Sequence, residues 1–150
     1  MSGRSQARSA ARLSAVQALY QHQMEEIALP RLLDEFHQHR LGRAQDDGED
    51  QLAEAEVAFF DDLVSGVIAR QEEIDGLLES RLAEGWKLDR LDKTMLQILR
   101  AGAYELLARQ DVPLGSAISE YVDVAHAFFD AREAKFINGV LDAVAKAVRS

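Results

Sequence analysis

The chain has 150 residues, of which 47% are hydrophobic and 29% are charged. This composition is typical of a folded globular domain rather than of a disordered segment. The absence of cysteine excludes disulfides, thiolate nucleophiles and cysteine-based zinc sites. No apolar run approaches the roughly 20 residues that span a bilayer, and the N-terminus carries no signal-peptide pattern. We therefore expect a soluble, cytoplasmic protein without membrane contact.

Charge is distributed unevenly along the chain. The formal net charge is -9, yet residues 1–24 carry +3, which leaves -12 for the remainder. The segment 46–62 contains eight carboxylates and no basic residue. A solvated loop and helix start is the simpler explanation of this acidic segment. The alternative is that it repels non-target polyanions from a nearby basic surface.

Residues 4–24 predict a first helix with two different surfaces. Arg4, Arg8 and Arg12 recur every four residues, which aligns them as a row about 6 Å apart along a helix. Guanidinium forks suit phosphate oxygens, so this row could meet successive backbone phosphates. An exposed, solubilising helix edge is the alternative explanation. A second side of the same helix is expected to face the core, with the residues Leu13, Val16, Leu19, Tyr20 and Met24.

The rest of the chain predicts six further helices. Apolar residues recur at helical spacing within segments that Gly, Pro or polar residues interrupt. These segments are 29–41, 52–68, 74–82, 88–107, 118–129 and 132–148. Residues 42–48 predict a loop, residues 70–72 a break, and Pro30 and Pro113 two helix starts. Strand patterns are nearly absent, so we predict an all-α fold of about seven helices forming a single domain over residues 1–150.

Within these helices, three details can be tested against a structure. The segment 88–107 is apolar around much of its circumference, which indicates a central, buried helix that Asp89 or Asp92 caps. Gly66 marks either a close approach between helices or a simple loss of helix stability of about 1 kcal/mol.

No locally readable catalytic, cofactor or metal motif is present. His37 and His39 are two residues apart and diverge on a helix, and the sequence has no His-Glu-x-x-His spacing. We expect surface or packing roles for these two and for His22 and His126, and we predict neither an enzyme nor a cofactor or metal. A second basic group lies at Lys135–Phe136, with Arg132 nearby. An aromatic beside a cation can stack on an unpaired base, although a core position is the alternative for Phe136.

Several segments together resemble the NusB family of bacterial transcription antitermination factors. They occur in the family's order from residue 8 to residue 142, whereas residues 28–54 match no part of its pattern. The segments are RSAAR (8–12), AVQALY (15–20), DLVSGV (62–67), ILRAGAYEL (98–106), VP (112–113), ISEYVDVA (118–125) and KFINGVLD (135–142).

This resemblance implies two small helical bundles sharing a core, without enzymatic activity. It implies binding of single-stranded boxA RNA in nascent ribosomal RNA transcripts, together with the ribosomal protein NusE. Other Nus factors and RNA polymerase would be contacted indirectly, to suppress termination. Some family members self-associate, so a homodimer is compatible with the resemblance. The positions that match the family's RNA-binding residues are Arg4, Arg8, Arg12, Tyr20, Lys135 and Phe136.

The chain departs from the family in its sparser N-terminal arginines, which predict a shallower salt dependence of RNA binding. NusE is then expected to supply the missing affinity by joint binding. Two alternatives stay open. One is a protein-interaction module with little RNA affinity. The other is a stand-alone relative of the RNA-binding domain of RNA cytosine methyltransferases, since such helical domains resemble this one.

Overall fold

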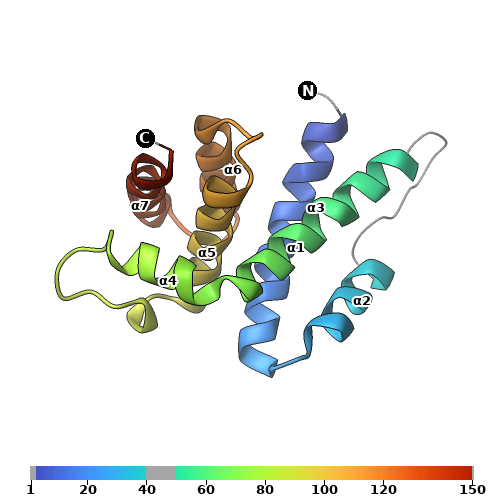
Figure 1. Cartoon of the computed structure of the whole chain (residues 1–150), viewed down its shortest axis with the longest axis horizontal. Coiled ribbons are helices and arrows are strands. Elements are labelled where there is room, and N and C mark those ends of the chain that lie inside the picture. Colours follow the sequence, from blue (N-terminus) through green and yellow to red (C-terminus); the bar gives the residue numbers. More distant parts are fainter. Residues whose placement is uncertain (1–2, 40–49, 150) are drawn as a thin grey trace. The chain divides into compact units, whose positions relative to one another are not determined.

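The computed structural model describes residues 3–39 and 50–149, and the side chains of residues 6–38 and 56–149. Within these ranges it contains seven α-helices, one short 3₁₀ helix and no strand (Figure 1). The helices are α1 (Gly3–Glu25), α2 (Leu29–His39), α3 (Asp50–Ala69), α4 (Gln71–Glu79), η1 (Leu88–Arg90), α5 (Lys93–Ala108), α6 (Leu114–His126) and α7 (Ala131–Val148). The predicted all-α fold is confirmed.

The chain divides into two compact units, residues 1–65 and residues 66–150. The first unit holds α1, α2 and most of α3. Its core includes Phe36 of α2 and Phe60 of α3, whose rings stack with centroids 5.3 Å apart. His37 Nε2 lies 2.6 Å from Asp61 Oδ1, so the same two helices are also joined by a polar pair. The packing role expected for His37 is thus the one that the structure shows.

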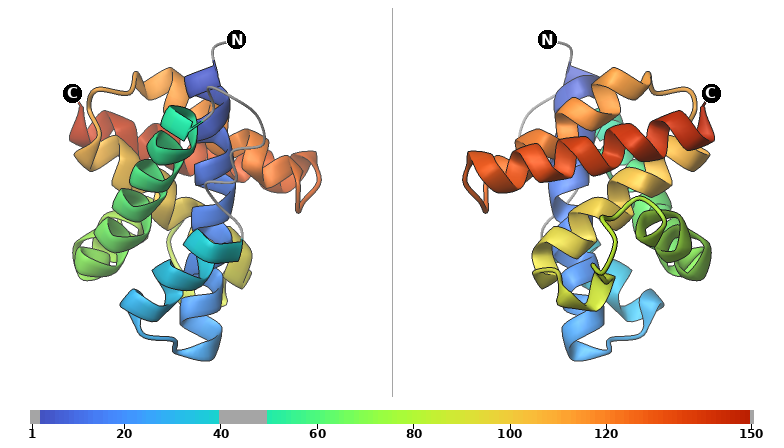
Figure 2. Two further views of the ribbon diagram at one scale, coloured as in Figure 1. Left: turned by 90° about the vertical axis from the view of Figure 1, so that its right-hand side faces the viewer. Right: turned by 90° about the vertical axis from the view of Figure 1, so that its left-hand side faces the viewer.

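The second unit is built around α5, which packs against α4, α6 and α7. Figure 2 shows α7 lying across α5 and α6. All residues of α5 from Met95 to Leu106 are buried, as the apolar character of the segment 88–107 predicts. The side chain of Asp92 accepts hydrogen bonds from the backbone N–H groups of Thr94 and Met95 and therefore caps the helix, whereas Asp89 lies within η1.

Small residues and polar pairs fix the approach of helices to α5. A Cβ atom at Gly66 would lie 2.1 Å from Cζ of Tyr104, so the close approach predicted at this glycine is confirmed. The Tyr121 hydroxyl donates a hydrogen bond of 2.8 Å to Oε1 of the buried Glu105. The Arg100 guanidinium donates two hydrogen bonds of 2.8 Å to the Asp75 carboxylate, which ties α4 to α5.

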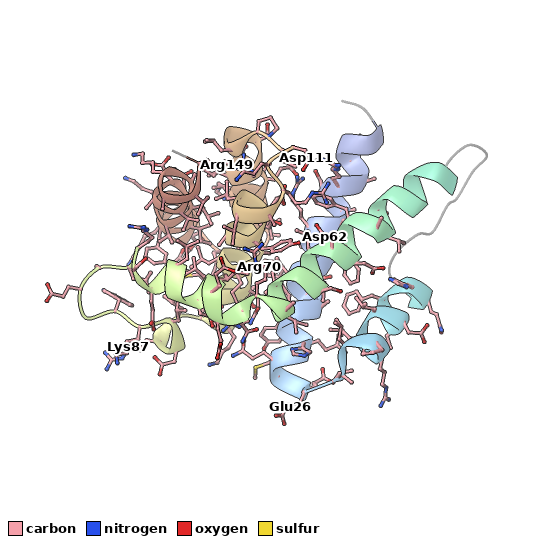
Figure 3. All side chains as sticks on the ribbon, viewed as in Figure 1. Glu26, Asp62, Arg70, Lys87, Asp111 and Arg149 are labelled. Atoms are coloured by element: carbon pink, nitrogen blue, oxygen red, sulfur yellow. The ribbon has the colours of Figure 1, made fainter. Side chains whose placement is uncertain are left out.

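Arg149, which directly follows α7, donates hydrogen bonds to backbone carbonyls at and just beyond the C-terminal end of α5. Its Nε donates to the Leu106 carbonyl at 2.9 Å, Nη1 to the Val112 carbonyl at 2.6 Å and Nη2 to the Arg109 carbonyl at 2.8 Å. A fourth, longer contact of 3.4 Å reaches the Glu105 carbonyl. The carbonyls of Glu105 and Arg109 also accept backbone hydrogen bonds from Arg109 and Val112, respectively, so Arg149 adds a second donor to these two. Figure 3 marks Arg149 among the side chains of the second unit.

Some predicted helix boundaries are wrong. Leu82 lies beyond α4, which ends at Glu79. The backbone N–H of Arg81 donates to the Leu78 carbonyl, three residues back, and the Ser80 hydroxyl donates to the Leu77 carbonyl at 2.8 Å. The segment 118–129 is displaced toward the C-terminus, since α6 begins at Leu114 and ends at His126. Phe128 lies in the following turn with 42% of its surface exposed. Residues 41–48, where the second helix and the loop were expected to meet, lie outside the described part of the chain.

The core-facing side of α1 also differs from the prediction. Met24 and Tyr20 were expected in the core but are 51% and 39% exposed, respectively. Val16 and Leu19 are buried as predicted, and the rest of the buried side consists of the alanines Ala7, Ala11, Ala15 and Ala18. None of the helices in residues 3–39 and 50–149 has the length and apolar character that crossing a bilayer requires.

Candidate nucleic-acid interface

The arginine row of α1 meets an aromatic ring of α3. The guanidinium carbons of Arg8 and Arg12 lie 4.7 Å and 5.0 Å from the centroid of the Phe59 ring. Both distances are within the roughly 6 Å over which a cation is attracted to an aromatic face. Phe59 is itself buried, with 2% of its surface exposed. Two of the three arginines therefore share one aromatic support within the first unit.

The two arginines differ in exposure. Arg12 is buried, with 4% of its surface exposed, whereas Arg8 is half-buried. An exposed, solubilising edge is therefore the wrong explanation for Arg12. The buried residues Ala11 and Ala15 flank Arg12 along the helix, which shows that Arg12 lies on the inward side of α1. Arg4 lies in the first turns of α1, and its side chain is outside the described residues.

Tyr20 lies on the same helix, eight residues after Arg12, which corresponds to about 12 Å along the axis. Tyr20 is exposed, as is Met24 one turn later, whereas Val16 and Leu19 are buried. A partly exposed tyrosine offers an apolar ring face and a polar hydroxyl to a ligand.

Lys135 and Phe136 lie in the first half of α7 and are both exposed, Phe136 by 38%. The buried side of this helix is formed by Ala134, Ile137, Val140 and Leu141. The core position considered for Phe136 is therefore wrong. Arg132, one turn earlier, is exposed as well, so an aromatic ring and two cations follow one side of α7.

The predicted site residues thus form two groups. Arg4, Arg8, Arg12 and Tyr20 belong to α1 in the first unit, and Lys135 and Phe136 belong to α7 in the second. The structure brings Arg8 and Arg12 together on Phe59, and it places Lys135 and Phe136 side by side on a surface. Phe59 was not predicted to take part, because its spacing is that of an ordinary core residue of α3.

Two carboxyls outside these groups have shifted pKa values. The exposed Arg70 guanidinium donates two hydrogen bonds to Glu73, which lowers the pKa of that carboxyl, and Figure 3 marks this arginine at the start of α4. Burial raises the pKa of Glu56 on α3. Within the described residues, no group of three or more His, Cys, Asp or Glu side chains is arranged to hold a metal ion.

Comparison with known proteins places these features in a family. The sequence model of the NusB family matches residues 9–146. The transcription antitermination protein NusB of Novosphingobium aromaticivorans is 71% identical over 143 residues, covering 95% of each chain. The protein of the same description from Sphingopyxis alaskensis is 61% identical over 149 residues, covering 99% of each chain.

Solved structures show the same fold. The structure of T. maritima NusB has a TM-score of 0.74 and 31% identity, covering 93% of this chain and 90% of that one. A structure described as antitermination factors NusB and NusE in complex with dsRNA has a TM-score of 0.78 and 27% identity, covering 95% and 98%. A family match over most of the residues, with relatives this similar in sequence and fold, shows that the chain belongs to the NusB family.

Proposed function

We propose that this protein is a transcription antitermination factor that binds boxA-type single-stranded RNA of nascent ribosomal RNA transcripts together with NusE. It acts in the cytoplasm without catalysing a reaction, and it reaches RNA polymerase through other Nus factors. The observation that carries the proposal is the exposed Lys135–Phe136 pair on α7. Core packing does not explain a large apolar ring that is exposed at the surface beside a cation. Stacking of an unpaired base on the ring would explain it.

The arginines of α1 contribute unequally in this proposal. Arg4 and the half-buried Arg8 supply charge to phosphates. Arg12 is buried, and its guanidinium group contacts the same Phe59 ring as that of Arg8. Arg12 therefore acts mainly by fixing the ring on which Arg8 lies. Not every arginine of the row then contacts a phosphate, which lowers the affinity for RNA. This explains why a chain with a net charge of -9 relies on a protein partner for RNA affinity.

The relatives support a role with RNA and NusE. A solved NusB is described in complex with NusE and double-stranded RNA. For this chain we propose single-stranded RNA, because stacking on Phe136 requires an unpaired base and stacking on an aromatic contributes about 1–3 kcal/mol per base. Duplex RNA of the same sequence is therefore a necessary comparison in any binding experiment.

Fluorescence anisotropy with labelled boxA-like RNA tests the proposal. Scrambled and duplex RNAs serve as competitors, and each titration is repeated with and without NusE over a series of salt concentrations. Lys135→Ala/Phe136→Ala is expected to weaken binding of the single strand about 5- to 150-fold, the equivalent of one lost stacking contact. Removing the Lys135 contact alone is expected to reduce the slope of log K against log salt by about 0.7.

Trp86 and Lys87 provide a matched control, because they form another exposed aromatic–cation pair, in the connection between α4 and α5. Trp86→Ala/Lys87→Ala removes the same kinds of group and should leave RNA binding unchanged. Equal losses from both double variants would show that the α7 pair is not a specific site. Equal affinity for boxA-like and scrambled RNA under every condition would refute the proposed function.

A second candidate, a protein-interaction module with little RNA affinity, is favoured by the burial of Arg12 and the net charge of -9. It predicts that the chain captures NusE from solution equally well with and without RNA. It also predicts that neither the Lys135→Ala/Phe136→Ala variant nor added boxA RNA changes that affinity. Calorimetric titration with NusE in the presence and absence of RNA separates the two candidates.

A further inference from the structure

Gly139 occupies the ninth position of the 18-residue helix α7 and is exposed. Glycine is a poorer helix former than alanine, so an internal helical glycine normally has a structural reason. Three other glycines of the second unit have one: a Cβ at Gly66 or Gly102 would lie 3.0 Å or less from a neighbouring side chain, and Gly85 has a φ of +88°. A Cβ at Gly139 would meet nothing within 4 Å. Neither packing nor backbone conformation within the chain explains this glycine.

The neighbours of Gly139 on the helix surface suggest an explanation. Residues three and four positions apart lie next to each other on a helix, so Gly139 adjoins Phe136 and Lys135. Helical side chains lean toward the N-terminus of their helix. A side chain at position 139 would therefore lean over the surface beside Phe136. The missing side chain leaves that surface open.

Gly76 shows that this open space alone is not informative. It is also an exposed, internal helical glycine, on α4, and a Cβ there would likewise meet nothing within 4 Å. Its neighbours on the helix surface, however, are the exposed carboxylates Glu72, Glu73 and Glu79. Gly139 has Lys135 one turn before it and Arg132 a further turn before that, both exposed. Asp142, one turn after it, is paired with Lys146 at 3.2 Å. Of these two glycine surfaces, the one around Gly139 combines bare backbone, an aromatic ring and cations.

We propose that Gly139 is a specificity-determining position of the RNA site: its bare backbone admits the nucleotide that stacks on Phe136. Arg132 and Lys135 then lie on the N-terminal side of the same nucleotide, where its phosphates are attracted. This inference rests on the proposed function and adds a steric requirement to it. A base is flat and wide, so a side chain at position 139 would compete with it for the space beside the ring, and a larger side chain would compete more.

The experiment is a graded set of substitutions, Gly139→Ala and Gly139→Leu, with Gly76→Ala and Gly76→Leu as matched controls. All four replace an exposed helical glycine by a better helix former. Thermal unfolding of each variant is therefore expected at the wild-type Tm or about 2 °C above it. Binding of boxA-like single-stranded RNA in the presence of NusE is measured on the same samples.

We expect Gly139→Ala to weaken RNA binding several-fold and Gly139→Leu more than about 10-fold, while both Gly76 variants bind like the wild type. Stability and binding thus move in opposite directions at position 139, which a purely structural role would not produce. Affinity for NusE alone is expected to stay at the wild-type value for every variant.

Four results would overturn the inference. Wild-type RNA affinity of Gly139→Leu, together with lost binding in Phe136→Ala, would leave the proposed function intact and refute the steric requirement. A lower Tm in the Gly139 variants would assign the glycine to the fold. Loss of NusE binding without RNA would assign this surface to the protein partner. Failure of the wild type to prefer boxA-like over scrambled RNA would instead refute the proposed function, and the inference with it.

Discussion

Replacing Arg149 by alanine removes one side chain that donates to four backbone carbonyls, two in the last turn of α5 and two in the segment that follows it. The three shorter contacts, of 2.6 to 2.9 Å, come from a charged donor, for which about 1.5–3 kcal/mol each is typical. Arg149 is half-buried, so water can reach part of the vacated space. We therefore reduce the contribution to about 1 kcal/mol per contact, or about 3 kcal/mol in total.

A loss of this size is measurable. For a chain of this length, 1 kcal/mol corresponds to about 2–4 °C in Tm, so Arg149→Ala is expected to lower Tm by roughly 6–12 °C. Arg149→Lys should fall between the variant and the wild type, because an ammonium group cannot span the carbonyls as a planar guanidinium does. Circular dichroism during thermal unfolding gives Tm, and hydrogen exchange shows whether protection is lost at the end of α5.

Lys146→Ala is the matched control. It removes the same charge from the last turn of α7, but its ammonium group is exposed and pairs only with Asp142 on the same helix. Such surface pairs contribute about 0.5 kcal/mol or less. A Tm of Arg149→Ala within about 1 °C of Lys146→Ala would refute the reasoning, since it would mean that water serves the carbonyls equally well.

Three further predictions concern stability, each read from urea unfolding. Gly66→Ala should lose about 1–3 kcal/mol, because its Cβ would lie 2.1 Å from the Tyr104 ring, and an unchanged midpoint would show that the ring moves aside without loss. Glu26→Gly should gain about 0.5–1 kcal/mol, since Glu26 has a φ of 54° that glycine adopts without strain, and a loss would contradict this. Burial raises the pKa of Glu56, so between its unfolded and folded pKa values the folded state still holds a proton that the unfolded state has released. The free energy of unfolding that this carboxyl contributes therefore falls as pH rises through that range. Glu56→Gln should therefore gain stability relative to the wild type as pH rises from about 4 toward neutral, and a constant difference would contradict it.

The fold was predictable from the sequence wherever one local rule decided the outcome. Asp92 precedes α5 and has free backbone N–H groups two and three residues later, so its capping role depends on its own neighbours. Pro113 precedes α6 for a similarly local reason. Gly66 was recognisable as unusual, but its partner Tyr104 belongs to another helix, so only the structure identifies what the glycine accommodates.

Burial was harder to predict than helix formation. The apolar pattern of α1 favours Tyr20 and Met24 as core residues, but the packed side is formed mainly by alanines, whose small size gives a weak hydrophobic signal. Phe128 was assigned to a continuing helix because its spacing fits, whereas the chain turns after His126. In both cases the outcome depends on which neighbouring helix is present, and a pattern within one helix does not contain that information.

The candidate site shows the same division. The spacing of the α1 arginines and the Lys135–Phe136 pair are visible in the sequence. That Arg12 is buried on the ring of Phe59 is not, because the two residues come from different helices and their contact depends on how α1 and α3 pack. Gly139 likewise became informative only once the space around it was known to be open.

The position of Arg149 in the sequence also has a kinetic consequence. The carbonyls that it contacts lie 37 to 44 residues earlier in the chain, so the contact forms only after α6 and α7 have packed on α5. Contacts of such separation close large loops and are made late in folding. Stabilising interactions that are absent from the transition state act chiefly on the unfolding rate. We therefore expect Arg149 to lengthen the lifetime of the folded second unit while leaving the speed of its folding nearly unchanged.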